Sequence, residues 1–306
     1  MVDPEFRTDF AKDSLNRTLA ALAVIASILI FAVQDVWVAA LVRDREPLVL
    51  TFWIFLGVTA IAFLIAIFRG ERLPLNRATL IALARFNLST AFSWGFTFLA
   101  LSRVSPNVVS AATLSTPPIM IMLLVERKLR LNAVSALALF SVILGLLIGL
   151  CSNSGEVKFD YIGLIYCALA SVGVVGNSIC MRALNMLGCK GNPVLSSRFI
   201  FLLGGIGLYY ILEKGSIPLP AENFVTISAL TLVTTYIPLL ILYFAHLHLS
   251  IYRINIGLAM TPVATFLIVG LIYGTHELDV FQYISLFLVV AGVLIEFGKG
   301  VGDEQN

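Results

Sequence analysis

Long apolar runs separated by short polar breaks follow one another along almost the whole chain. A helix needs roughly 20 mostly apolar residues to cross a bilayer, and the runs are continuous rather than alternating, which favours helices over barrel strands. The pattern therefore predicts an all-α membrane protein with ten transmembrane helices. The expected spans are 18–41, 48–68, 79–101, 105–125, 132–151, 159–181, 193–212, 223–246, 252–273 and 279–298.

The second half of this pattern repeats the first. Residues 46–57 resemble 192–203 at a shift of 146 residues, and 111–117 resemble 256–262 at a shift of 145. Each half then holds an odd number of spans, so the second half is inverted relative to the first. We expect four parts in the chain: a polar N-terminal segment 1–17, a first five-helix repeat 18–151, a second five-helix repeat 152–298, and a tail 299–306.

The Lys and Arg residues between the spans predict the orientation. With the N-terminus in the cytoplasm, the cytoplasmic segments hold 13 of them and the opposite side holds 5. Basic residues are enriched on the cytoplasmic side of membrane proteins, so both termini are expected there. Only 12% of the residues are charged, against about 25% in soluble domains, and this deficit extends along the chain, which excludes a soluble domain with a single anchor.

No pattern in the chain indicates an enzyme or a resident cofactor. The four cysteines lack metal-ligand spacing and are interpreted as small buried residues. A phosphate-binding glycine loop, a nucleophile elbow and a pair of acids placed for catalysis are all missing. A membrane-embedded transferase would need such groups and a sizeable loop, and a non-transporting scaffold would need an apolar interface, so both remain only as alternatives.

The motifs of the chain resemble the drug/metabolite transporter superfamily, in its EamA-like branch. The resemblance covers residues 18–298. It is carried by Pro262-Val263, Gly270, Glu277-Leu278, Gln282, Gly292-Val293, Ser197-Arg198-Phe199, Ala100-Leu101, Ala111, Pro117 and Glu126-Arg127-Lys128-Leu129. It implies a ten-helix carrier without a cofactor that exports or exchanges amino acids or related compounds.

Ionisable groups within spans are candidate sites, because a charge inside a bilayer is costly. Gln34 and Asp35 in the first span are predicted substrate contacts. Asp35 is interpreted as a cation-binding or proton-accepting carboxylate, or as one satisfied at the outer interface. Arg85 and Arg198 each lie about six residues into a span. They bind an anionic substrate group or extend to the cytoplasmic headgroups.

The third span carries a polar and aromatic stripe on one helical face. It comprises Asn87, Thr90, Trp94 and Thr97, at the spacing of one face of a helix. Trp94 can stack on a planar or cationic substrate, whereas the polar residues either line the path or join helices. The remaining predicted substrate contacts are Asn177 in the sixth span and Tyr236 and Tyr243 in the eighth.

Two Thr-Pro pairs at corresponding places in the halves predict a hinge beside the cavity: Thr116-Pro117 and Thr261-Pro262. Proline removes a backbone N–H and interrupts the helix, and paired interruptions in the two halves point to the binding site. The histidines give little indication of a functional site, because His246 and His248 point to different faces of the eighth span.

The sequence favours a secondary active transporter, an exporter or exchanger of a small organic metabolite such as an amino acid. It would work by alternating access around a midplane cavity, as a monomer in a bacterial inner membrane. Its partners are the small-molecule substrate, the lipid bilayer and a coupled proton or counter-substrate, without nucleic acid. The alternative is a carrier for an anionic, nucleotide-like or vitamin-like metabolite, favoured if Arg85 and Arg198 both face the cavity.

Overall fold

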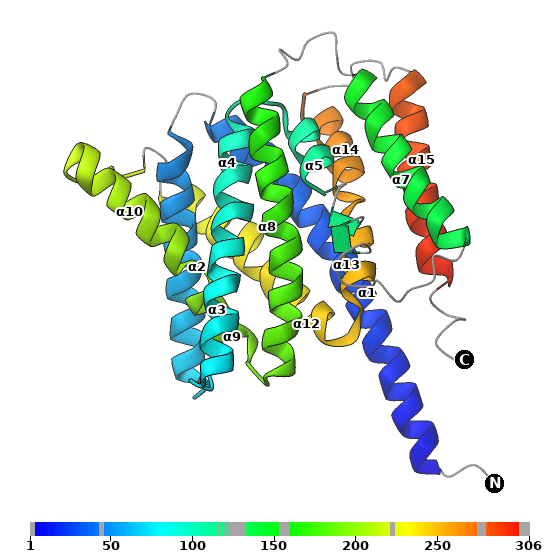
Figure 1. The fold of residues 1–306 in the computed structure, drawn as a ribbon, viewed down its shortest axis with the longest axis horizontal. Helices are drawn as coiled ribbons and strands as arrows, with labels where there is room; N and C mark the ends of the chain where they lie inside the picture. The colour runs from blue at the N-terminus through cyan, green and yellow to red at the C-terminus, as the bar shows by residue number, and fades with distance from the viewer. Residues whose placement is uncertain are drawn as a thin grey trace.

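The computed structural model of the chain is built from helices (Figure 1). The described residues contain no strand. The structure describes residues 4–42, 46–114, 117–118, 120–121, 133–152, 160–220, 224–273 and 280–299. The helices of the first half are α1 (Pro4–Val42), α2 (Pro47–Phe68), α3 (Arg77–Thr90), η1 (Ala91–Gly95), α4 (Phe96–Leu101), α5 (Pro106–Leu114) and α7 (Ala133–Ser152). Those of the second half are α8 (Tyr161–Met186), α9 (Gly191–Ser197), α10 (Ile200–Lys214), α11 (Phe224–Ala229), η3 (Leu230–Tyr236), α12 (Ile237–His248), α13 (Ile251–Leu258), α14 (Thr261–Tyr273) and α15 (Val280–Lys299).

Six helical segments within the described residues are long and apolar enough to cross a membrane. They are Leu15–Val42, Pro47–Phe68, Tyr161–Met186, Gly191–Lys214, Phe224–His248 and Ile251–Ile272. The other expected spans contain helix as well, but their described parts do not meet this combined measure of length and hydropathy. The all-helical membrane fold is therefore confirmed, whereas the count of ten spans stays a prediction.

Two of the long helices contain a segment of π-helix. In the first half η1 joins α3 to α4, and in the second half η3 joins α11 to α12. Pro238 lies in the first turn of α12, where its missing N–H leaves a carbonyl of the preceding turn without its usual partner. The Thr235 hydroxyl in this region donates to the Leu230 carbonyl at 2.8 Å. Such π-segments often lie at functional sites.

Close packing between the helices depends on small residues on α8. A Cβ atom added to Gly173 would lie 2.2 Å from the Ser93 nitrogen, and one added to Gly176 would lie 2.2 Å from the Ser89 hydroxyl oxygen. Neither position can hold a larger residue without a shift of α3 or η1. Glycine thus lets the two helices approach closely, as small residues do in membrane proteins, and it marks the face of α8 that packs against α3 and η1.

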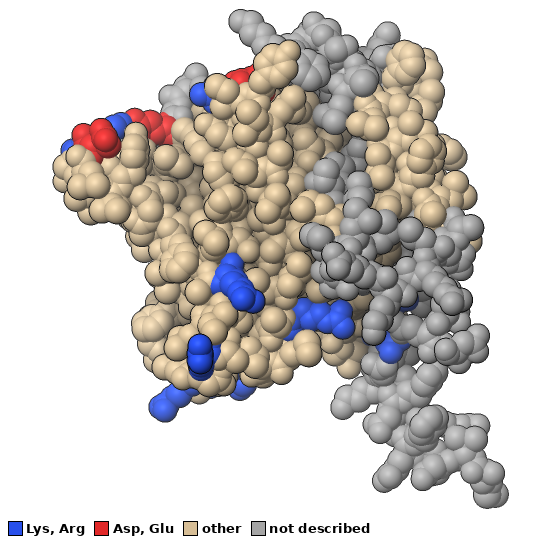
Figure 2. Space-filling model, viewed as in Figure 1, with Lys and Arg blue, Asp and Glu red and all other residues tan. Residues whose placement is uncertain are grey.

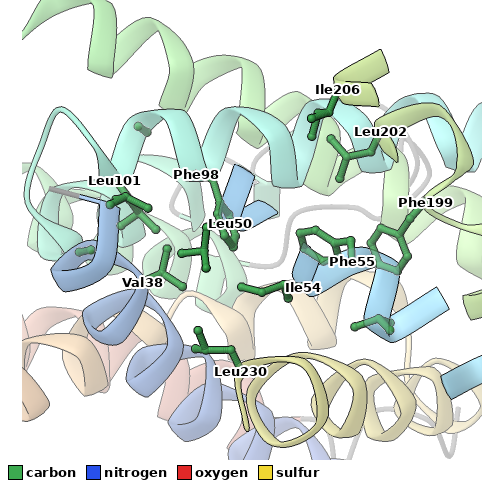
Figure 3. Packing of buried hydrophobic residues seen from close by; sticks show 14 of the residues in the cluster. Val38, Leu50, Ile54, Phe55, Phe98, Leu101, Phe199, Leu202, Ile206 and Leu230 are labelled. Carbon is green, nitrogen blue, oxygen red and sulfur yellow. The ribbon is translucent and has the colours of Figure 1, made fainter. Parts of the chain in front are cut away.

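The main hydrophobic core joins α1, α2, α4, α10 and η3 (Figure 3). Phe55 on α2 stacks on Phe199, which lies between α9 and α10, with ring centroids 4.5 Å apart. Ile54 and Leu230 pack against the same cluster. A separate pair, α7 and α15, lies side by side at one edge of the molecule (Figure 1).

Charged side chains are unevenly distributed on the face shown in Figure 2. The Lys and Arg side chains of the described residues lie mostly over the lower half, and the Asp and Glu side chains lie at the upper edge. The N-terminal end of α1 and the C-terminal end of α15 both point toward the lower side (Figure 1). This agrees with a cytoplasmic lower side, although the orientation stays a prediction.

Candidate functional site

A cavity of about 120 Å³ lies between helices of the two halves. A single buried water needs roughly 10–15 Å³, so the space admits several waters or a small organic molecule. The first half contributes Phe31, Asp35, Ser93, Trp94, Thr97, Val109, Ser110, Thr113 and Leu114 to its wall. The second half contributes Val174, Asn177, Ser178, Met181, Arg198, Leu239, Leu242, His246 and Leu258.

Asp35 supplies the negative charge of the cavity. It lies on α1, half-buried, and its carboxylate accepts a hydrogen bond of 2.7 Å from the Ser110 hydroxyl on α5. Ser110 Oγ also lies 3.2 Å from the Thr265 hydroxyl on α14. This chain of hydroxyls links three helices, and within the described part of the protein Asp35 forms no ion pair.

Arg198 supplies the positive charge. It lies at the break between α9 and α10, only 5% exposed. Its Nε donates to the Thr90 hydroxyl at 3.1 Å, and that hydroxyl in turn donates to Asn177 Oδ1 at 2.9 Å. The guanidinium carbon lies 4.7 Å from the ring centre of Phe86, a favourable cation–π distance. No carboxylate of the described residues pairs with Arg198, so neutral groups alone compensate its charge.

Trp94 also lines the cavity, and it lies on the π-segment η1. Its ring is held by aromatic neighbours from two other helices: Phe31 with centroids 6.0 Å away and Phe55 at 5.1 Å. Rings at these separations and angles make favourable edge contacts. The indole is therefore a rigid part of the wall rather than a mobile side chain.

His246 is a cavity residue that the sequence reasoning missed. It lies in the last turn of α12, lines the cavity and is close enough to Arg198 to interact electrostatically. Its Nδ1 is buried without a hydrogen-bond partner among the described residues. The sequence carried one signal, because the helical face of Leu239 and Leu242 continues to position 246.

Five of the predicted substrate contacts lie outside the cavity wall. Gln34 donates to the Thr235 hydroxyl at 2.9 Å, and Asn87 donates to the Ser197 carbonyl at 2.7 Å. The other three are the exposed Arg85, Tyr236, which donates to Asn192, and Tyr243, which donates to the Cys189 carbonyl. Asp35, Trp94, Asn177 and Arg198 are the four that the structure brings together at the cavity. Their roles in binding remain predictions.

Only some residues of the predicted hinge lie within the part of the chain that the structure describes. Thr261 begins α14, and Pro262 occupies its second position, after the break that separates α13 from α14. The Thr261 hydroxyl is buried without a hydrogen-bond partner among the described residues. Pro117 is buried in a short described segment, and Thr116 lies outside the described residues. An interruption is thus present at the second Thr-Pro pair, whereas the hinge role stays a prediction.

Metal ligands do not gather in the described part of the chain. No group of three or more His, Cys, Asp or Glu side chains there could hold a metal ion. Cys167, Cys180 and Cys189 are buried and form no disulfide. The cavity therefore offers binding by charge, hydrogen bonds and an aromatic face.

Residues 18–151 match the model of the EamA-like transporter family. The first half of the chain belongs to this family, which is part of the drug/metabolite transporter superfamily. No curated protein matches the chain. A solved structure described as "Crystal structure of protein" is similar over 93% of this chain and 99% of its own, with 15% identity and a TM-score of 0.71. At that identity the likeness concerns the fold alone.

The match of residues 18–151 to the EamA-like family agrees with the apolar helices. The protein is an integral, multi-pass membrane protein of the drug/metabolite transporter type. Members of the family are transporters rather than enzymes, so a small-molecule substrate and a lipid bilayer are its expected partners.

Proposed function

We propose that the protein is a secondary active transporter, exporting or exchanging a small organic metabolite such as an amino acid. The observation that carries this proposal is the cavity itself, because helices of both halves form its wall and it holds Asp35 and Arg198 without ionic partners. A charge kept away from water is costly unless it is compensated. A polar or ionic substrate supplies that compensation when it enters.

Alternating access is supported by the way the two halves pack. In order along the sequence, the first and eighth helical segments (α1, α12) are in contact, and so are the third and sixth (α3, α8). The first segment corresponds to the sixth and the third to the eighth, so exchanging the two halves converts one contacting pair into the other. Inverted repeats of this kind allow each half to adopt the conformation of the other and thereby open opposite sides. We therefore propose two five-helix repeats, 18–151 and 152–298, with both termini in the cytoplasm of a bacterial cell.

Polar contacts beside the cavity support the same correspondence. In the first half Ser110 on α5 donates to Asp35 on α1. In the second half Asn255 on α13 donates to Ser178 on α8, at 3.0 Å. Each contact joins the first helix of a half to the fourth. Only the first includes a carboxylate, so Asp35 is the proposed site for coupling to a proton or another cation.

A carrier for an anionic metabolite is the second candidate. It is favoured by the donor groups at one end of the cavity, where Arg198, Asn177 and His246 lie close together. Arg85 does not contribute to this end, because its side chain is exposed on α3. In the first candidate Asp35 can contact the substrate itself. In the anionic-substrate candidate Asp35 contacts only the coupling cation.

Counterflow in proteoliposomes tests the proposal. Vesicles loaded with amino acids, short peptides, amines, nucleosides or nucleotides are given the same labelled compounds outside. The vesicles contain wild type, Asp35→Asn or the exposed-residue control Leu208→Ala. We expect one compound to accumulate in wild type and the control. Asp35→Asn should still exchange it but no longer concentrate it against a pH gradient. Absence of exchange by a folded protein across all five pools would contradict the proposal.

A further inference from the structure

The two charges of the cavity lie at different depths. Phe31 on α1 contacts Trp94 on η1, so these two residues mark a common level. Asp35 lies one helical turn beyond Phe31, and Thr90, which holds Arg198, lies one turn from Trp94 along its own helix. The first and third helical segments run in the same direction across the molecule (Figure 1), so these turns lead away from Trp94 to opposite sides.

The separation between the charges follows from helix geometry. Eight residues at about 1.5 Å each place the backbone levels of Asp35 and Thr90 roughly 12 Å apart along the helix axes, and the charged groups are taken to lie at these levels. A charge-assisted hydrogen bond at each end takes up roughly 3 Å. The ligand itself is then left with roughly 6 Å between its own charged groups. A single extended residue covers only about 3.5 Å, whereas two cover about 7 Å.

We infer that the cavity takes an elongated dipolar organic ion of about the length of a dipeptide, with its ammonium group at Asp35 and its carboxylate at Arg198. This inference rests on the proposed transport function and narrows it. A single α-amino acid carries both charges too close together to reach both residues at once. It would leave one of the two cavity charges without an ionic partner.

The end at Asp35 has the chemistry of an ammonium site. One carboxylate oxygen already accepts from Ser110, and the other forms no hydrogen bond with the described residues. The hydroxyl oxygen of Ser110, which lines the cavity and contacts Thr265 behind it, is an adjacent acceptor. An ammonium group has three donors and no acceptor, so it matches a set of groups that is rich in acceptors.

The end at Arg198 has the opposite character. Nε is used by Thr90, while the two terminal nitrogens of the guanidinium form no hydrogen bond with the described residues and are not sealed from the cavity. Asn177 uses its carbonyl oxygen on Thr90, which leaves its amide NH₂ group as a further donor. A planar guanidinium fork matches a carboxylate in geometry as well as in charge.

Trp94 lies between the two ends and lines the cavity with its indole. Because Phe31 and Phe55 hold the ring in place, it offers a fixed apolar surface to the middle of the ligand. A peptide-like backbone or an apolar side chain fits against such a surface better than a hydrated ion does. The three features therefore describe one ligand and not three separate ones.

A series of probes of increasing length tests the inference. Glycine, diglycine, triglycine and tetraglycine with free termini are titrated into the protein in lipid nanodiscs, and affinity is measured by calorimetry. We expect the tightest binding at two residues, with glycine weaker by about 10- to 100-fold because it loses one charge-assisted contact. Tightest binding by glycine, affinity independent of length, or no binding by any member would overturn the inference.

A probe with a blocked amino terminus tests whether Asp35 binds the ammonium group. N-acetyl-diglycine should bind wild type about 10- to 100-fold more weakly than diglycine, but Asp35→Asn should hardly distinguish the two probes. Asp35→Asn keeps the size of the side chain and its contact with Ser110, and Glu46→Gln, at an exposed carboxylate paired with Lys214, is the matched control. An equal acetylation penalty in Asp35→Asn and wild type would show that the ammonium lies elsewhere and overturn the inference.

Binding and transport can fail separately. If glycine both binds best and exchanges in counterflow, the transporter proposal stands and the inferred length is wrong. If diglycine binds with the predicted dependence on Asp35 but nothing exchanges, the dipolar site stands and the transporter proposal fails.

Discussion

Arg198 and Asn177 are joined through a single hydroxyl group. Thr90 accepts from Nε of Arg198 at 3.1 Å and donates to Oδ1 of Asn177 at 2.9 Å. The three residues come from α3, α8 and the break between α9 and α10. This link orients the remaining donors of both side chains toward the cavity, and it crosses the boundary between the two halves.

Replacing Thr90 by valine should disconnect these two side chains. Thr90→Val keeps the shape but leaves Arg198 and Asn177 each without a buried partner, so we expect unfolding to become easier by about 1–3 kcal/mol and substrate affinity to fall. Thr90→Ser retains the hydroxyl and should behave nearly as wild type. Thermal unfolding and substrate titration in nanodiscs measure both effects. Equal stability of the two variants would mean that the hydroxyl link contributes nothing.

Gly173 should tolerate no side chain. Alanine there would bring its Cβ within 2.2 Å of the Ser93 backbone, so Gly173→Ala should lower the melting temperature and displace η1, which carries Trp94. Gly205 on α10 has nothing within 4 Å of an added Cβ. Gly205→Ala should be neutral or stabilising by up to about 1 kcal/mol, since alanine favours helix. The same change in melting temperature for both variants would refute close packing as the reason.

A substitution at Tyr236 distinguishes a structural role of this residue from a contact with substrate. Its hydroxyl donates to Asn192 at 2.8 Å, and Asn192 in turn donates to Glu71 at 3.0 Å. We expect Tyr236→Phe to cost about 1–3 kcal/mol of stability, because Asn192 loses a buried partner, and to leave substrate affinity unchanged. Differential scanning fluorimetry and substrate titration measure the two quantities. A loss of affinity at unchanged stability would instead place Tyr236 in contact with substrate.

Asp160 should make the start of α8 sensitive to acid. Its carboxylate accepts from the backbone N–H groups of Ile162 and Gly163 and pairs with Arg103 at 2.9 Å. The hydrogen bond from the Arg103 guanidinium, followed by those from the backbone, holds the pKa of Asp160 below its ordinary value. A depressed pKa in the folded state adds stability above the pKa of the unfolded chain, and this is lost as pH falls through the folded pKa.

The measurement for Asp160 is a melting curve between about pH 7 and pH 3, the range in which an ordinary aspartate titrates. Wild type should lose more stability than Asp160→Asn over this interval, because asparagine keeps the cap but does not titrate. The exposed position makes the difference small. Identical pH profiles of the two proteins would show that the Asp160 carboxylate does not contribute to the loss of stability in acid.

The sequence predicted the helices well because the apolar runs and their breaks are local. It also predicted an interruption at Pro262, since proline excludes itself from a helix interior. It could not distinguish Arg85 from Arg198, which lie at similar depth in their spans. Arg85 is exposed and Arg198 is buried, and this difference depends on which face of each helix meets a neighbour.

The cavity residues follow the same logic. Asp35 and Trp94 stand out in the sequence because a carboxylate and an indole are conspicuous in an apolar run. His246 did not, because its contact with the cavity depends on how α12 is rotated against α1. The π-segments η1 and η3 shift the register of the residues that follow them, and that shift arises from tertiary packing as well as from the sequence.

The central claim is that the cavity opens to each side of the membrane in turn, and labelling of single cysteines tests it most directly. Thr97→Cys and Leu242→Cys place thiols at the cavity. Leu208→Cys places a thiol on the apolar outer surface of a membrane helix and is the control. All three variants are made with the four native cysteines replaced. A membrane-impermeant maleimide is added to sealed vesicles from either side. The account predicts that both cavity positions react from both sides and that the control does not react. Reaction from one side only would contradict it.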